Sequence, residues 1–87
     1  MAIKKVNYNK TNIAELPNDK SVLVRVETKS GGLNYLGVIA RGKVVSQLTE
    51  LLGEVPGATL KYEQFDSIKD ARTKQANILK RSEPKYS

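Results

Sequence analysis

Alternating apolar and polar positions predict a β-hairpin between Ser21 and Ala40. Val22, Val24 and Val26 are each separated by one residue, and such period-two alternation of β-branched residues is typical of a half-buried strand. The segment 29–32 ends in two glycines, which supply the positive-φ positions that a tight turn needs. Residues 35–39 are again mostly apolar, so we expect them to run back alongside the first strand.

The period changes after the turn at 40–43. Apolar residues then recur with helical spacing at i, i+4, i+7 and i+8, namely Val44, Leu48, Leu51 and Leu52. One apolar face over about three turns predicts a helix near 43–52, with Gly53 as its C-terminal stop. This stripe is expected to lie in the core.

Residues 58–63 alternate once more and predict a third strand, with Ala58, Leu60 and Tyr62 on one side. Phe65 follows directly and is expected to plug the core, because the chain has few large apolar residues.

A second helix is predicted over 67–81. Ser67 followed by Asp70 has the form of a capping box, in which a serine side chain caps the first turn. The expected buried stripe consists of Ile68, Ala71, Ile78 and Leu79. Gln75 lies on the same stripe, where a polar side chain needs a partner unless it reaches water at the edge of the stripe.

These elements predict one small α+β domain over 19–87. A three-stranded antiparallel sheet, formed by the hairpin 21–40 and the strand 58–63, is flanked by helices near 43–52 and 67–81. Residues 1–18 are mostly polar, and we expect them to be a partly ordered lead-in.

Composition excludes several kinds of chemistry. The 87 residues include no cysteine, histidine or tryptophan, so disulfides, zinc sites with thiolate or imidazole ligands, and Ser/His/Asp or Cys/His nucleophiles are ruled out. No apolar run approaches the ~18 residues of a membrane span, and no apolar core of a signal peptide follows Met1. We therefore expect a cytoplasmic protein with no membrane partner.

Charge points to an acidic partner. The chain has 15 Lys+Arg against 9 Asp+Glu, a net charge of +6, and its basic residues crowd the first ten and last twenty positions. A positive field over so small a domain favours nucleic acid, although a lysine-rich surface also serves solubility alone.

The order of the elements and the short motifs resemble the GIY-YIG nuclease domain. That family has a strand with Gly-Ile-Tyr, a second strand with Tyr-Ile-Gly about ten residues later, a helix opening with arginine, a third strand, and a helix with a glutamate. Here Val22-Leu23-Val24 is followed after ten residues by Tyr35-Leu36-Gly37. Pro56-Gly57-Ala58, the helix start at 67–71 and the closing Pro84-Lys85-Tyr86-Ser87 are also similar to the family.

In the family, two tyrosines and the arginine surround the scissile phosphate and the glutamate holds a metal ion. The resemblance implies that Tyr35 is the second tyrosine, whereas Val24 stands where the first belongs. Gln47 falls near the arginine position, although Arg41 or Lys43 could reach the same space. Gln75 occupies the glutamate position, and Ser87 replaces the closing asparagine. An uncharged amide is a poor ligand for a hard divalent cation, so these departures indicate a pseudoenzyme.

The leading interpretation is thus a non-catalytic nucleic-acid-binding protein without cofactors, contacting DNA more than RNA, mainly at phosphate. The residues assigned to this surface are Arg25, Tyr35, Arg41, Lys43, Gln47, Arg72, Lys74 and Gln75.

Two alternatives stay open. One is a small inhibitor or adaptor that docks on an acidic protein. The other is a divergent endonuclease in which Glu63, Asp66 or Asp70 holds a divalent metal such as Mg²⁺; these acids have ready structural roles as strand surface, turn and helix cap.

Overall fold

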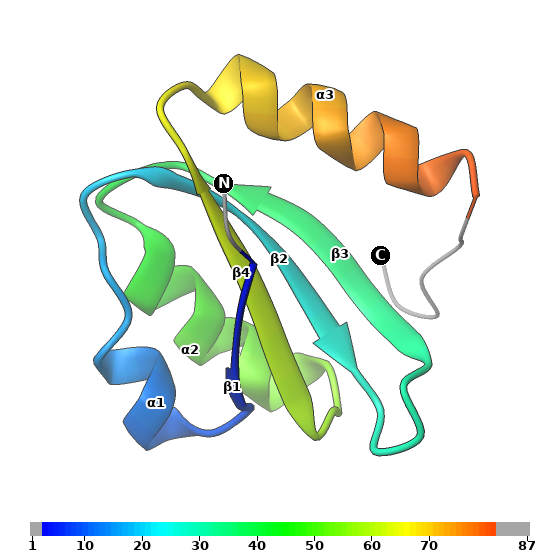
Figure 1. Cartoon of the computed structure of the whole chain (residues 1–87). Coiled ribbons are helices and arrows are strands. Elements are labelled where there is room, and N and C mark those ends of the chain that lie inside the picture. The colour runs from blue at the N-terminus through cyan, green and yellow to red at the C-terminus, as the bar shows by residue number, and fades with distance from the viewer. Residues whose placement is uncertain (1–2, 82–87) are drawn as a thin grey trace.

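A computed structural model describes residues 3–81, which form a four-stranded antiparallel sheet and three helices (Figure 1). In chain order the elements are β1 (Lys4–Asn7), α1 (Lys10–Ala14), β2 (Ser21–Glu27), β3 (Leu33–Ile39), α2 (Val44–Glu54), β4 (Thr59–Phe65) and α3 (Ile68–Leu79). The strand order is β1-β4-β2-β3, so the hairpin β2–β3 is joined by β4 on its β2 side. The predicted α+β class and the order hairpin, helix, strand, helix are confirmed.

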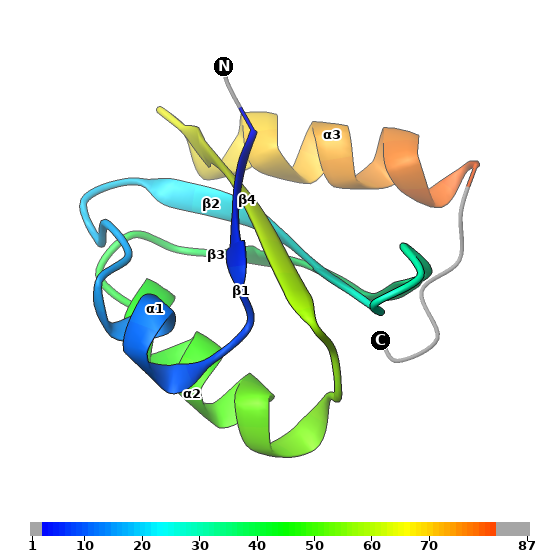
Figure 2. The ribbon, with the colours of Figure 1, turned by 60° about the horizontal axis from the view of Figure 1, so that its bottom comes forward.

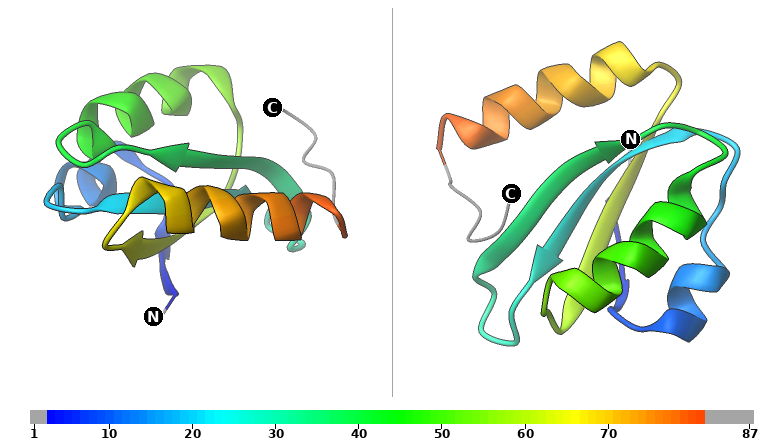
Figure 3. Two further views of the ribbon diagram at one scale, coloured as in Figure 1. Left: turned by 90° about the horizontal axis from the view of Figure 1, so that it is seen from above. Right: turned by 180° about the vertical axis from the view of Figure 1, so that it is seen from behind.

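The helices form a layer on each face of the sheet. Figure 2 shows α1 and α2 below the sheet and α3 above it, and the rear view in Figure 3 shows α1 and α2 in front of the strands. Helix α3 packs mainly on β2 and β3. We call the two sides of the sheet the α2 face and the α3 face.

The main core lies on the α2 face. Val22, Val24 and Val26 are fully buried there against residues such as Ile13 and Leu48, as the alternation predicts. Each such side chain contributes roughly 1.5–3 kcal/mol of favourable transfer free energy. Because α3 covers the other face of the same strand, Leu23 is buried as well. The first half of β2, through Val24, is therefore buried on both faces, whereas Arg25 and Glu27 in its second half are half-buried.

The N-terminal segment is part of the fold. Residues 3–18, expected to be a partly ordered lead-in, contain β1 and α1, and β1 pairs with β4 as a fourth strand. The predicted three-stranded sheet is thus one strand short. Tyr8, Ile13 and Leu16 from this segment belong to the core. The short, polar strand β1 gives no periodic signal; its pairing with β4 and the packing of Val6 against the core hold it in place.

Helix α2 is confirmed, with its predicted stripe facing the core, but it continues through Gly53 and ends at Glu54. The first backbone N–H of the helix, that of Val44, donates a hydrogen bond to Asn18 Oδ1 at 2.8 Å. A side chain 26 residues earlier in the chain therefore caps this helix.

Helix α3 begins as predicted, since the Ser67 side chain accepts a hydrogen bond from the Asp70 backbone N–H at 3.2 Å. Its stripe is only partly buried. Ala71 is buried and Ile78 half-buried, but Leu79 is 42% exposed because α3 covers only part of the sheet. Phe65 at the end of β4 is half-buried and lies outside the main core, so the core plug predicted there is wrong.

None of the helices within residues 3–81 is both long enough and apolar enough to cross a membrane. The closing motif at 84–87, with Ser87, lies outside the described residues.

Candidate nucleic-acid interface

Strand pairing brings three cationic residues into one row across the sheet. Lys5 of β1 lies opposite Lys61 of β4, and Lys61 lies opposite Arg25 of β2. Residues directly opposite each other in an antiparallel pair share a face, and adjacent strands are about 5 Å apart. Arg25 alternates with the core-facing Val24 and Val26, so the row lies on the α3 face.

This row occupies a part of the sheet that α3 leaves open. Figure 1 looks onto the α3 face and shows α3 crossing its upper edge, with β1, β4 and the lower half of β2 uncovered by the described elements. Lys5 is exposed, whereas Arg25 and Lys61 are half-buried. The stems of the latter two therefore lie along the sheet.

Two carboxylates partly balance the row and the adjoining helix. Lys61 Nζ lies 3.2 Å from Glu27 Oε1, and Lys74 of α3 forms an ion pair with the buried carboxylate of Glu63. Among residues 3–81, neither Lys5 nor Arg25 forms an ion pair. We call the row Lys5, Arg25 and Lys61, together with Lys74 of the adjoining helix α3, the sheet cations. These four positive charges exceed the two negative charges of Glu27 and Glu63 by two.

Tyr35 and Gln47 meet on the opposite side of the molecule. Both line a hollow of about 190 Å³ between β3 and α2 on the α2 face. Its other lining residues are Ile39, Glu50, Leu51 and Glu54, so among residues 3–81 its charged lining groups are carboxylates and none is a cation. Such a lining repels phosphate.

Gln75 does not reach this hollow. Its Nε2 donates to the main-chain carbonyl of Leu36 at 3.4 Å, from the α3 side of β3. The predicted polar residue on the α3 stripe thus has a partner, the strand backbone. Tyr35 and Gln75 approach the same strand from its two faces and do not form one cleft.

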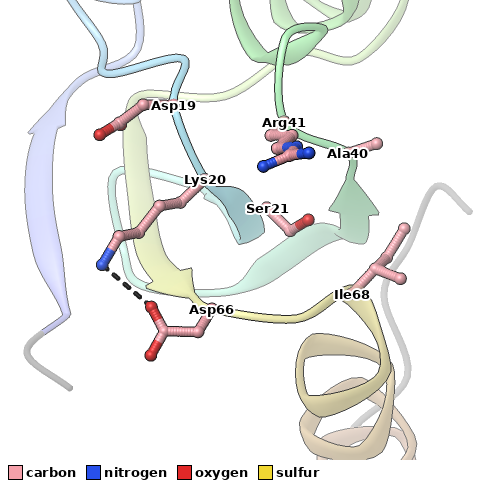
Figure 4. Close-up of a pocket in the computed structure, with 7 residues that line it drawn as sticks. All are labelled: Asp19, Lys20, Ser21, Ala40, Arg41, Asp66 and Ile68. Carbon is pink, nitrogen blue, oxygen red and sulfur yellow. Dashed lines mark ion pairs between the residues drawn. The ribbon is translucent and has the colours of Figure 1, made fainter.

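The remaining predicted residues are dispersed. Arg41 lines a hollow of about 460 Å³ where the ends of β2, β3 and β4 meet (Figure 4). On the other side of that hollow, Lys20 Nζ lies 3.0 Å from Asp66 Oδ1. Lys43 is exposed at the start of α2, and Arg72 is exposed on α3. Of the predicted residues, only Arg25 and Lys74 belong to the sheet cations.

The acids considered as metal ligands lie apart. Glu63 pairs with Lys74, Asp66 pairs with Lys20, and Asp70 lies in the first turn of α3 beside its cap. Within 3–81, no group of three or more acidic side chains is arranged to hold a metal ion.

Sequence reasoning missed Lys5 and Lys61. Lys61 lies between Leu60 and Tyr62 in a predicted strand, so the alternation implies that its side chain points away from the core. The sequence does not show that Lys5 and Arg25 lie beside Lys61, because strand pairing decides this and β1 is not predicted.

Comparisons with protein-family models, curated proteins and solved structures gave no match.

Proposed function

We propose that this protein is a non-catalytic nucleic-acid-binding domain that contacts phosphate through the sheet cations. The observation that carries the proposal is the row Lys5, Lys61, Arg25 on the part of the α3 face that the described elements leave open. Like charges directly opposite one another weaken a sheet, yet here they lie on three adjacent strands. An anionic polymer seated on the row would remove that repulsion and release its counterions.

The relation to GIY-YIG nucleases is part of this proposal and rests on element order. A hairpin, a helix, a strand that pairs beside the first hairpin strand, and a second helix follow one another here. The proposal places binding away from the Tyr35 position, because that hollow has carboxylates where a phosphate would need cations. Gln75, bonded to the strand backbone, supports a structural role at the position where the family has its glutamate.

The test is fluorescence anisotropy with a labelled DNA duplex at low salt, repeated over a salt series. Lys5→Gln and Arg25→Gln should each weaken binding several-fold and lower the salt slope by about 1, as expected for loss of one phosphate contact. Lys10→Gln is the matched control: it removes the same charge from α1, an element that packs with α2 on the opposite side of the sheet.

No detectable binding at low salt would overturn the proposal, and so would equal losses in all three variants. The same duplex, incubated with the protein and Mg²⁺, should remain intact on a denaturing gel. Cleavage would overturn the non-catalytic part and restore the endonuclease alternative.

A further inference from the structure

The hollow beside Tyr35 has the composition of a receptor for a positively charged side chain. Ile39 and Leu51 give it apolar surface, the half-buried Tyr35 supplies an aromatic ring, and Glu50 and Glu54 bring carboxylates. Arginine and lysine bury an apolar stem and carry a charge at the tip, so they match such a lining along their length. The volume of about 190 Å³ is of the size of one such side chain.

The two glutamates destabilise the helix that carries them. Glu50 and Glu54 are four residues apart on α2, and like charges at this spacing repel. Glu54 is in the last turn, where the helix dipole is unfavourable to a negative charge and where α2 has no basic residue. Among residues 3–81, neither carboxylate is in an ion pair, so no described contact offsets this cost.

The Tyr35 ring, which lines one side of the hollow, is held in place by its own strand. A Cβ on Gly37 would lie 2.6 Å from the Tyr35 hydroxyl oxygen and 2.7 Å from ring atom Cε2, so the ring lies directly over the glycine. The ring packs against the main core at the same time. It therefore presents a steady face to the hollow.

We propose that this hollow binds an arginine side chain of a partner protein. The guanidinium would stack on the Tyr35 ring and meet the carboxylates of Glu50 and Glu54, while its stem contacts Leu51. Arginine suits the site better than lysine, because its planar group stacks on aromatic rings and bonds carboxylates with a fixed fork of donors. Basic partners, not acidic ones, fit this face.

The experiment is an NMR titration of the isotope-labelled full chain with the blocked peptide acetyl-Gly-Arg-Gly-amide. Because the protein carries a net charge of +6, a cationic peptide is repelled overall, and binding must come from a local acidic site. Saturable shifts confined to the amides around Tyr35, Gln47, Glu50 and Glu54 are expected. The neutral acetyl-Gly-Gln-Gly-amide should produce none.

Variants distinguish binding in the hollow from non-specific electrostatic attraction. The double change Glu50→Gln and Glu54→Gln should reduce affinity about tenfold, the effect of losing ~1.4 kcal/mol of binding free energy. Glu15→Gln is a control for loss of negative charge elsewhere, since it removes one exposed carboxylate at the end of α1, outside the hollow. Tyr35→Leu tests stacking and should weaken binding several-fold.

Three results would overturn the inference: no saturable shifts, equal shifts with both peptides, or undiminished affinity in the double variant. If MgCl₂ shifted these amide signals and the peptide did not, the hollow would be assigned to a metal ion instead.

Discussion

At the scale of single residues, Gly37 shapes the surface of the molecule by leaving room for its neighbour. The Tyr35 ring occupies the space that a side chain at 37 would need, with closest approaches of 2.6–2.9 Å to a built Cβ. Gly37 is not one of the glycines with positive φ, so the constraint is steric and not conformational. Tyrosine and glycine two residues apart on one face of a strand thus act as a unit.

Gly37→Ala should lower the free energy of unfolding by about 1–3 kcal/mol, because the added methyl forces the ring off its site. Urea denaturation measures this change. Gly53→Ala is the matched control: it lies inside α2 with open space around its Cβ position and should stabilise the protein by about 0.5–1 kcal/mol.

A double variant isolates the contact. Gly37→Ala combined with Tyr35→Ala should lose less stability than the two single losses together, because the clash exists only when both side chains are present. Strict additivity would show that the alanine at 37 destabilises the strand by some other route.

At the scale of elements, α2 is held at its two ends in different ways. Its start is capped by Asn18, whereas its last turn carries Glu54, a negative charge that the helix dipole disfavours. Its apolar stripe, led by the buried Val44 and Leu48, keeps it on the sheet. Packing stabilises this helix, and its charges do not.

Glu54→Lys should therefore raise the free energy of unfolding by about 0.5–1 kcal/mol, because it replaces a repulsive pair with an attractive one and puts a cation in the last turn. Glu50 would precede the new lysine by four residues, which is the favourable order for such a pair. Thermal denaturation at low salt measures the gain. In 1 M salt the gain should shrink, because exposed charges are screened within about 3 Å; a gain that is insensitive to salt would contradict the electrostatic reason.

At the scale of the whole molecule, Tyr8 ties the N-terminal segment to the C-terminal end of α2. Its hydroxyl donates to the Val55 main-chain carbonyl at 3.0 Å, across 47 positions of sequence. Burial, and secondly the nearby Tyr35, raises the pKa of Tyr8 to about 12 from its usual 10.0. The neutral phenol is thus favoured in the folded state.

The free energy of unfolding should fall as pH rises from about 10 to about 12. In this range the unfolded chain releases the Tyr8 proton while the folded chain retains it. Below pH 10 the contribution is complete. Urea denaturation at about pH 8, 10 and 11 should show a shallower decline for Tyr8→Phe than for the unchanged protein.

At about pH 8 the same variant should be less stable by about 1 kcal/mol, because Val55 loses its hydrogen-bond donor. Equal declines with pH in both proteins would contradict the assigned titration.

The elements with strong periodicity were predictable because local pattern and tertiary burial agree in them. The alternating valines of β2, the apolar stripe of α2 and the Ser67 cap all appear where the sequence places them. Strand β1 has four residues and only one apolar side chain, so its pattern carries no signal. The end of α3 was misjudged because an apolar residue in a helix is buried only where another element covers it, as the exposed Leu79 shows.

The candidate site was only partly predictable. Residues sharing an element, such as Lys74 and Gln75, could be placed on one helix from sequence. Whether they share a site depends on the faces they present: Lys74 reaches Glu63 of β4, and Gln75 reaches the backbone of β3.

Composition and patterns within a few residues were enough to establish the excluded chemistry, the excess positive charge and the hairpin. Which charges stand together depended instead on the tertiary structure. The pairing of β1 with β4 and of β4 with β2 aligns Lys5, Lys61 and Arg25, which lie far apart in the chain. The packing of α2 places its glutamates beside Tyr35. Register and packing join residues that are distant in sequence, and no local pattern contains that information.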